Sequence, residues 1–391
     1  MIDFSLTPYD QAQLDRTREA ALICRKYARY YDDNEGEFPP DELPEAADFY
    51  ANQEPLPSPG ESDTSQPVLM VLQAIGQFWG DYSVRLRQGK GGGLGNAALA
   101  AAGTPEQQKK WSHLMLSMAI TEPGCGSDPS MVSTTAVLDG DEWVLNGEKI
   151  FVTTGIRAGG VVLWATIDKS AGRAGIKSFF VEKGTPGFEV PHKEKKLGIR
   201  SDDTACYVFR DCRIPRGNLL GGDESVPKKS SGGFRGVMKT FNMTRPLTAA
   251  MGLGLARAAL DFTREQLEKA GIQLEYGSAI GAQSAVAEKF MRFEALSEAS
   301  ELTTMNCTWL AGEGQPNNME SSICKAHAGS AVRAITQGCV ELLGPMGISH
   351  EHLLEKWMRD CRITDIYEGT GEIQRLIIAR GLFDYTRVDL S

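Results

Sequence analysis

The chain has 391 residues, enough for two or three packed domains, and its apolar fraction of 41% is ordinary for a globular protein. No stretch approaches a membrane span, and the N-terminus lacks a charged-then-apolar signal pattern, so we expect no membrane partner. The net charge of −10 comes without a basic stripe, which disfavours nucleic acid as a partner.

The first segment, residues 8 to about 115, is predicted to be mainly helical. Residues 68–78 are apolar enough for a buried helix, and a further helix is expected around 107–111. Between residues 33 and 67 the chain is acidic and rich in proline, which predicts a loop with one short helix near 45–50.

From about residue 117 to 225 the pattern becomes alternating, which predicts short strands separated by turns. Asp139-Gly140 and Asn146-Gly147 are both typical of hairpin turns. This pattern favours a small antiparallel barrel or sandwich. The expected strands are 134–138, 143–145, 150–154, 161–167, 179–181 and 205–209.

Beyond a connector at 216–233 the helical period returns. Four amphipathic helices are predicted, over residues 244–268, 285–310, 321–343 and 371–383. The expected fold is therefore an α+β multidomain chain. Its predicted parts are an N-terminal helical domain (1–116), a central β domain (117–225) and a C-terminal helical bundle (226–391).

The cysteines and histidines give little sign of a metal site. Eight scattered cysteines contain no Cys-x-x-Cys pair, and the five histidines lack the His-x-x-x-His spacing of a helical site. We therefore expect no metal. Free thiols in a cytoplasmic enzyme are the expected state of the cysteines.

The octet from Thr121 to Asp128 (TEPGCGSD) is a specific local motif. Its proline and two glycines force a tight, irregular turn at the entrance to the predicted β domain. Such a turn can direct backbone N–H groups and the Thr121 and Ser127 hydroxyls at one ligand. A purely structural turn is the ordinary interpretation of a Pro-Gly pair, but the whole octet, followed by Asn146-Gly147-x-Lys149, favours ligand binding.

A second motif surrounds Glu368, in the run IYEGTGEIQR at residues 366–375. A glutamate is most often a solvated surface group. Here its apolar and aromatic neighbours predict partial burial, and burial raises the pKa of a carboxyl group toward the range of a general base. These neighbours are Ile363, Ile366, Tyr367 and Ile373.

The two motifs, in this order, resemble those of the acyl-CoA dehydrogenase family. Two further segments support the resemblance: FNMTRP at residues 241–246, and Leu343-Gly344-x-x-Gly347 ahead of Arg359-Asp360. The similarity extends from about residue 1 to 386. It implies a helical N-terminal domain, a central β domain and a C-terminal four-helix bundle, in agreement with the layout predicted from periodicity.

The resemblance also implies FAD as the cofactor, an acyl-CoA thioester as the substrate and desaturation of its 2,3 bond. Glu368 would take the α-proton while the β-hydride passes to flavin N5. Hydrogen bonds to the thioester oxygen stabilise the developing enolate, and the backbone N–H of Glu368 would supply one of them. Some branches place the base at the position of Thr244, where threonine cannot serve, which leaves Glu368 as the predicted base.

Position by position, the resemblance predicts the ligand contacts. The predicted FAD contacts are Met118, Ile120, Thr121, Ser127, Phe151, Thr153, Gln273, Thr370 and Glu372. The predicted substrate contacts are Ser127, Asn242, Arg245, Tyr367 and Gly369. Phe151 stands where tryptophan is common in the family, and Asn242 replaces a usual aspartate.

Three departures from the family pattern concern the FAD diphosphate. Gln273 stands where the family has an arginine that reaches the neighbouring subunit, and about three extra residues precede it. Ser284, beside Gln283, replaces a glutamine, and Glu341 replaces another. One positive charge is lost and one negative charge is added at a partly buried site, where two charges interact by about a few kcal/mol, so we expect weaker FAD binding.

Several functions stay open on sequence alone. The first is a catalytic acyl-CoA dehydrogenase, a homodimer or homotetramer that passes electrons to an electron-transferring flavoprotein. The second is one subunit of a heteromeric dehydrogenase with FAD sites between unlike chains. The third is a flavin-free homologue that has the fold but no catalytic activity. The intact Glu368 argues against this third option. An oxidase or a non-redox thioester lyase on the same scaffold is a related option. The sequence does not indicate the length or branching of the acyl chain.

Overall fold

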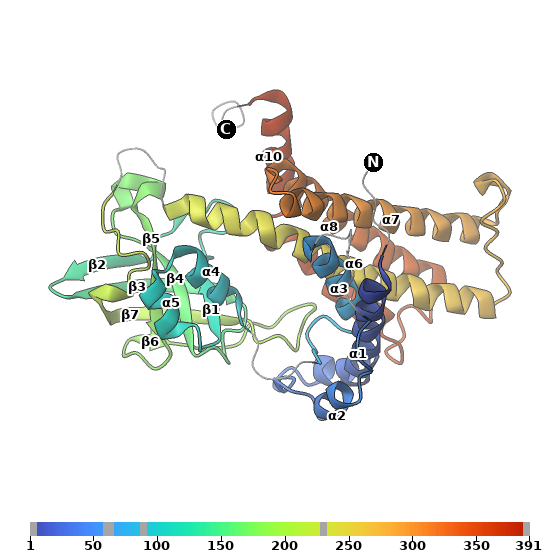
Figure 1. Ribbon diagram of the computed structural model, residues 1–391, viewed down its shortest axis with the longest axis horizontal. Helices are drawn as coiled ribbons and strands as arrows, with labels where there is room; N and C mark the ends of the chain where they lie inside the picture. Colours follow the sequence, from blue (N-terminus) through green and yellow to red (C-terminus); the bar gives the residue numbers. More distant parts are fainter. Residues whose placement is uncertain (1–5, 58–65, 87–91, 227–232, 386–391) are drawn as a thin grey trace. The chain divides into compact units, whose positions relative to one another are not determined.

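The structure, a computed structural model, describes residues 6–57, 66–86, 92–226 and 233–385, and of residues 233–243 it describes the backbone only (Figure 1). Packing divides the chain into two units. Unit 1 comprises residues 1–88, 197–201 and 242–391, and unit 2 comprises residues 89–196 and 202–241. The three-domain division at 116/117 and 225/226 stays a prediction.

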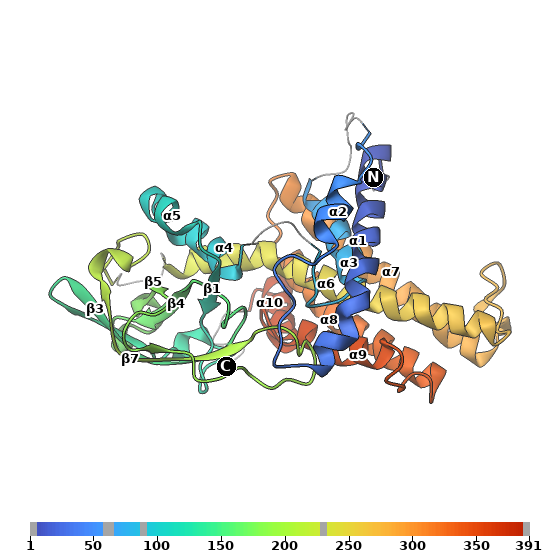
Figure 2. The ribbon, with the colours of Figure 1, turned by 90° about the horizontal axis from the view of Figure 1, so that it is seen from below.

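Unit 1 is built from helices. α1 begins at a capping box in which the Thr7 hydroxyl accepts from the Asp10 N–H and the Asp10 carboxylate accepts from the Thr7 N–H, both at 3.2 Å. Figure 2 shows α1 running beside α3. The described helices are α1 (Pro8–Asp33), α2 (Ala46–Ala51), α3 (Gln66–Phe78), α6 (Gly233–Lys269, in this unit from residue 242), α7 (Ala285–Gly312), α8 (Asn318–Leu343), α9 (Leu354–Asp360) and α10 (Gly371–Phe383).

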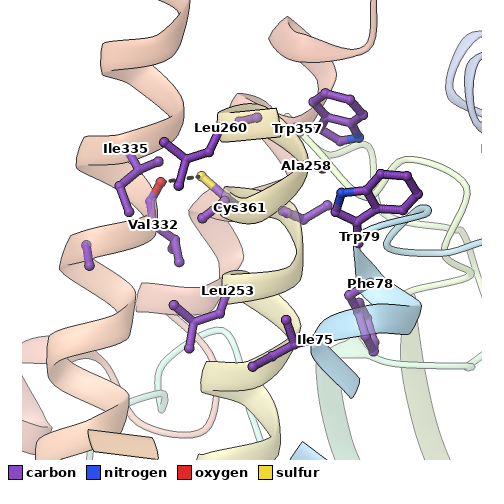
Figure 3. Packing of buried hydrophobic residues seen from close by; sticks show 14 of the residues in the cluster. Ile75, Phe78, Trp79, Leu253, Ala258, Leu260, Val332, Ile335, Trp357 and Cys361 are labelled. Atoms are coloured by element: carbon purple, nitrogen blue, oxygen red, sulfur yellow. Dashed lines mark hydrogen bonds between the residues drawn. The ribbon is translucent and has the colours of Figure 1, made fainter. Parts of the chain in front are cut away.

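The core of unit 1 forms around α6. Leu253 and Leu260 of α6 lie between Ile75 of α3 and Val332 of α8 (Figure 3), and all four side chains are at most 5% exposed. Burying one such side chain contributes about 1.5–3 kcal/mol. The core therefore fixes α6, which carries Thr244, against the helices on both of its sides.

A buried charge cluster ties α9 to the rest of unit 1. The Lys356 ammonium lies 2.6 Å from a carboxylate oxygen of both Asp81 and Asp360. The other oxygen of Asp360 accepts the Ile199 N–H, which holds residues 197–201 against α9. Because all three ionic side chains are at most 1% exposed, removing one of them would leave a buried charge unpaired.

Unit 2 contains a curled sheet, the short helices α4 (Leu94–Ala102) and α5 (Pro105–Trp111), and the start of α6 up to residue 241. The strand order is β1-β4-β2-β3-β7-β6, with β5 paired to β4. The sheet is mixed, because β4 runs parallel to β1 and β2, so the prediction of a purely antiparallel domain was wrong in these pairings. The strands are β1 (Leu116–Ala119), β2 (Thr135–Asp139), β3 (Glu142–Val152), β4 (Gly160–Thr166), β5 (Ile176–Glu182), β6 (Phe188–Glu189) and β7 (Ala205–Pro215).

The two predicted hairpin turns have different outcomes. Asp139 and Glu142 pair across the β2–β3 turn, in which Gly140 has a φ of 63°, so this turn is confirmed. Asn146-Gly147 lies inside β3 instead, at a register irregularity where β3 continues to pair with β7. The second turn was therefore wrong, because pairing with a distant strand keeps the chain extended through the irregularity.

Both faces of the central strand β4 are covered. Val161 and Leu163 point into a core with Phe179 of β5, while Trp164 points to the opposite face. Figure 2 shows α4 and α5 on one side of β4 and β5. There the ring of Trp111 stacks on Phe180, with ring centroids 4.2 Å apart. Burial on both sides explains why β4 is continuously apolar instead of alternating.

The described residues also bear on the predicted absences. None of the helices in the described ranges has the length and apolar character needed to cross a membrane. Nor do the described His, Cys, Asp and Glu side chains form a group of three that is arranged for a metal ion. All eight cysteines are buried free thiols, and burial raises the pKa of Cys212 to about 11, which makes that thiol unreactive.

Candidate active site

Glu368 lies in the turn between a short 3-10 helix (Cys361–Asp365) and α10. Its φ is 57° and that of Gly369 is 89°, so two successive residues occupy the left-handed region. The φ of Gly369 favours glycine, and a Cβ there would lie 2.4 Å from the Gln374 Nε2 atom, so any other residue would also displace that amide. A non-glycine residue in this region costs about 1–3 kcal/mol, and such strain is concentrated at functional sites.

The Glu368 carboxylate is half-buried and hydrogen-bonded. The Thr244 hydroxyl of α6 donates to its Oε2 atom at 2.8 Å. Burial raises the pKa of Glu368, and the Thr244 hydrogen bond with the charges of Arg245 and Lys325 offsets only part of that increase. The predicted burial of this segment is confirmed for Glu368, although the neighbouring Ile366 is 57% exposed. A carboxyl group with a raised pKa suits proton abstraction.

Tyr367, the residue before Glu368, is held by unit 1. Its hydroxyl is hydrogen-bonded to the hydroxyl of Tyr82 and lies 3.7 Å from the Met251 Sδ atom. The ring of Tyr82 in turn packs edge-on against Phe78, with centroids 5.1 Å apart. The motif predicted a role for Tyr367, but no local sequence signal pointed to Tyr82.

The octet of unit 2 has its own internal anchor at Glu122. The Oε1 atom of Glu122 accepts from the Thr134 hydroxyl at 2.6 Å and from Lys149 Nζ at 2.7 Å, and its Oε2 atom accepts from Ser133. Lys149 also donates to the Ile120 carbonyl at 2.9 Å. The octet and the Lys149 of the later motif are therefore parts of one hydrogen-bonded assembly.

The residues predicted to contact FAD from unit 2 lie on β1, in the octet and at the end of β3. The Ile150 N–H donates to the Thr121 carbonyl at 2.9 Å, which brings the octet beside Phe151. Phe151 has a φ of 54° and is 57% exposed. Half-buried are Met118, Ile120, Thr121 and Thr153, whereas Ser127 is exposed.

The other predicted contacts lie in unit 1. Thr370 accepts the Ile373 N–H and caps α10, and Glu372 lies exposed in its first turn. Arg245 is 4% exposed, with Nη1 3.5 Å from the Ser322 hydroxyl, and Gln273 is exposed in the turn between α6 and α7. The side chain of Asn242 lies outside the described part of the chain. The ligand roles of all these residues stay predictions.

Two family models match the chain. The model described as "Acyl-CoA dehydrogenase, middle domain" matches residues 117–212, and "Acyl-CoA dehydrogenase, C-terminal domain" matches residues 231–383. The chain belongs to the acyl-CoA dehydrogenase family.

Similar proteins of the acyl-CoA dehydrogenase family include short-chain enzymes. The chain is 37% identical to the mitochondrial short-chain specific acyl-CoA dehydrogenase of Rattus norvegicus over 283 residues, which is 71% of this chain and 66% of that protein. The match thus spans slightly less than two thirds of that relative. The chain is also 33% identical to the acryloyl-CoA reductase (NADH) of Anaerotignum propionicum over 72% of this chain and 71% of that protein.

Solved structures of acyl-CoA dehydrogenases have the same fold. The butyryl-CoA dehydrogenase of Megasphaera elsdenii aligns with a TM-score of 0.78 at 26% identity, covering 97% of this chain and 100% of that one. A glutaryl-coenzyme A dehydrogenase in complex with glutaryl-CoA aligns with a TM-score of 0.80 at 22% identity, covering 99% and 98% of the two chains. The helices and the curled mixed sheet are therefore those of the family fold.

Proposed function

We propose that this chain is a FAD-dependent acyl-CoA dehydrogenase that desaturates an acyl-CoA thioester between its α and β carbons. The observation that carries the proposal is the state of Glu368. Its carboxylate is half-buried, accepts a hydrogen bond from Thr244 at 2.8 Å and has a raised pKa. Membership of the family and the similarity to short-chain acyl-CoA dehydrogenases support the same reaction.

In the proposed reaction Glu368 removes the α-proton of the thioester, and the electron pair of that C–H bond begins to form the new double bond. A hydride leaves the β carbon at the same time, and bound FAD supplies the acceptor for it. The backbone N–H of Glu368 donates to the thioester oxygen, on which negative charge develops. Positioned proton transfer of this kind contributes about 10²–10⁴-fold to the rate.

The residues of unit 2 fit a flavin. Phe151 has a strained left-handed backbone and leaves its ring 57% exposed, so burial of that ring in the core does not explain the conformation. Half-buried Met118 and Ile120 add apolar surface, and Thr121 and Thr153 add hydroxyls. An apolar surface edged by polar groups matches an aromatic ring system with polar margins. These residues would hold the flavin ring of FAD.

The finer features of the proposal follow the family. We propose that α6, α7, α8 and α10 form a four-helix bundle, and that the chain forms a homodimer or homotetramer. We also propose that an electron-transferring flavoprotein accepts the electrons. One structural neighbour, described as "Electron transferring flavoprotein of Acidaminococcus fermentans", aligns with a TM-score of 0.77 at 26% identity.

A heteromeric enzyme is the second candidate, and one observation favours it. The cations around the α6–α7 turn are already paired with carboxylates: Arg264 with Glu294, Lys269 with Glu265, Lys289 with Glu341, and Arg292 with Glu288. Gln283 donates to the Glu275 carbonyl at 2.9 Å within the turn, and Ser284 caps α7. Each of these cations has a carboxylate partner and Gln273 carries no charge, so in this candidate an unlike subunit supplies the cation for the diphosphate.

One experiment separates these candidates. The protein is purified alone, its flavin spectrum is recorded, and a panel of acyl-CoA thioesters of increasing chain length is tested with a dye acceptor. A yellow protein that reduces the dye with at least one thioester supports the homo-oligomeric dehydrogenase. A colourless protein that regains flavin and activity only with an unlike subunit supports the heteromer. A flavin-loaded protein that no thioester reduces contradicts both.

A further inference from the structure

Lys325 is a buried lysine below the Glu368 turn. It lies on α8, its side chain is fully buried, and its Nζ atom donates to the Gly369 carbonyl at 2.8 Å. Among the described residues this is the one hydrogen bond that its ammonium makes. Burying an ammonium group costs several kcal/mol unless partners offset it. A methionine of similar length would fill the position of Lys325 at a lower cost in folding free energy.

Gln374 of α10 contacts the same turn. Its Nε2 atom donates to the carbonyls of both Glu368 and Gly369, at 3.1 Å each, and its side chain is fully buried. Gly369 makes room for this amide, since a Cβ there would lie 2.4 Å from Nε2. The two carbonyls of the left-handed pair thus receive three hydrogen bonds from two buried side chains.

These contacts bear on the geometry of the proposed base. The φ values of 57° at Glu368 and 89° at Gly369 fix the directions of the Glu368 side chain and of its backbone N–H. A left-handed glutamate persists only where its surroundings enforce it. Thr244 contacts the carboxylate, whereas Lys325 and Gln374 contact the backbone. The Lys325 charge also lowers the pKa of Glu368, and Gln374 carries no charge, so Gln374 isolates the backbone contact.

We propose that Lys325 and Gln374 are positioning residues, which hold Glu368 and Gly369 in the left-handed conformation and so aim the Glu368 carboxylate and N–H at the substrate. This inference rests on the proposed function. It assigns the buried lysine a task that its position in the core alone does not explain, and it predicts a loss in kcat instead of a loss in substrate binding.

The test uses the flavin-loaded enzyme and three variants: Lys325→Met, Gln374→Met and, as a control, Gln337→Met. Gln337 lies on α8 as Lys325 does, but it is exposed, and within the described ranges its amide donates to Glu341 alone. Amide hydrogen–deuterium exchange is followed by mass spectrometry for a peptide covering residues 363–373. The melting temperature, kcat and KM are measured for the same preparations with a thioester that the wild type oxidises.

We expect Lys325→Met and Gln374→Met to speed exchange in this peptide by about tenfold, because opening the turn no longer breaks these hydrogen bonds. We expect kcat to fall by about 10–100-fold with KM within about threefold, since a displacement near 1 Å at a reacting group has effects of this size. Gln337→Met should match the wild type in both measurements. Lys325→Met is the variant more prone to misfold, and Gln374→Met then decides the question.

The proposal is overturned if both variants exchange like the wild type, or if exchange quickens while kcat is unchanged. It is also overturned if Gln337→Met shows the same losses, because the effect would then be general destabilisation. Failure of the proposed function looks different: no thioester would reduce the wild-type flavin. The exchange measurement would still show whether Lys325 and Gln374 hold the turn.

Discussion

Replacing Lys149 by methionine tests how the octet of unit 2 is held. Lys149 is fully buried and pairs with Glu122, which is 4% exposed, at 2.7 Å. The substitution keeps most of the volume of the side chain but removes the cation. Glu122 would keep the hydroxyl and N–H donors of Ser133 and Thr134 and would lose its charge partner.

The size of the effect follows from the pKa of Glu122. Burial alone raises this pKa, but the Lys149 charge and the hydrogen bonds from Lys149, Ser133 and Thr134 lower it from 4.5 to about 2. At about 1.36 kcal/mol for each pKa unit, this lowering corresponds to about 3 kcal/mol of stability. Burial lowers the pKa of Lys149, and the cost of burying that ammonium offsets part of this gain. Removing one partner of a buried pair costs about 3–5 kcal/mol, which is of the same order.

The sign of the pH dependence follows from the same shift. A carboxylate whose pKa is lowered by folding stabilises the native state above its unfolded pKa of 4.5, and this contribution is lost as the pH falls from 4.5 toward 2. Lys149→Met should therefore be less stable than the wild type by about 3–5 kcal/mol at pH 7. The difference in unfolding free energy between the wild type and Lys149→Met should become smaller below pH 4.5.

The assay is denaturant unfolding of the wild type, Lys149→Met and the control Lys177→Met at pH 7 and pH 4. Lys177 pairs with Asp223 at 3.7 Å, and Asp223 is 71% exposed, so its loss should cost at most about 1 kcal/mol. Glu122→Gln combined with Lys149→Met should recover part of the loss, because no charge is left unpaired. Equal stability of Lys149→Met and Lys177→Met at pH 7 would show that the buried Glu122–Lys149 pair contributes no more than an exposed one.

Three further predictions concern the ligand-binding groups. Thr244→Val should move the rise of kcat with pH to higher pH, because Glu368 loses the hydrogen bond that lowers its pKa; an unmoved pH–rate profile would count against this contact. Gly369→Ala should lower kcat by more than about tenfold, since its Cβ would lie 2.4 Å from Gln374 Nε2 and its φ is 89°, and unchanged kinetics would contradict the geometry. Phe151→Ala should reduce the flavin content of the purified protein, measured from its absorbance, without lowering the melting temperature by more than about 2 °C, because its ring is 57% exposed.

Local signals predicted the helices of this chain well. The helical period predicts a helix over 371–383, and α10 spans Gly371–Phe383. The same period predicts a helix over 285–310, and α7 spans Ala285–Gly312. A 3.6-residue period is set by residues close together in the chain, so the sequence displays it directly.

Strand pairing was less predictable because it depends on distant segments. Asn146-Gly147 has the composition of a turn, yet β7 pairs with β3 on both sides of it. The parallel pairing of β1 with β4 likewise joins segments about 40 residues apart, a register that no local pattern encodes. Alternation identified most of the strands but not their partners.

The candidate site was predictable where its residues share a motif. Glu368 and the octet carry distinctive neighbours, and both stand out in the sequence. Tyr82 and Lys325 do not, because each reaches the Glu368 turn only through tertiary packing. Gln374 lies inside the Glu368 motif, but the sequence alone does not show that its amide donates to the turn. A lysine within an apolar helical pattern is a weak signal, and only its burial in the structure gives it meaning.

The role of Glu368 is tested most directly by mixing the wild type and Glu368→Gln, both loaded with FAD, anaerobically with the best thioester of the panel. The wild-type flavin should bleach rapidly. The variant should still bind the thioester, seen as a shift of the flavin spectrum, but should bleach slower by about 10²–10⁴-fold. Bleaching of Glu368→Gln at the wild-type rate would show that Glu368 is not the base.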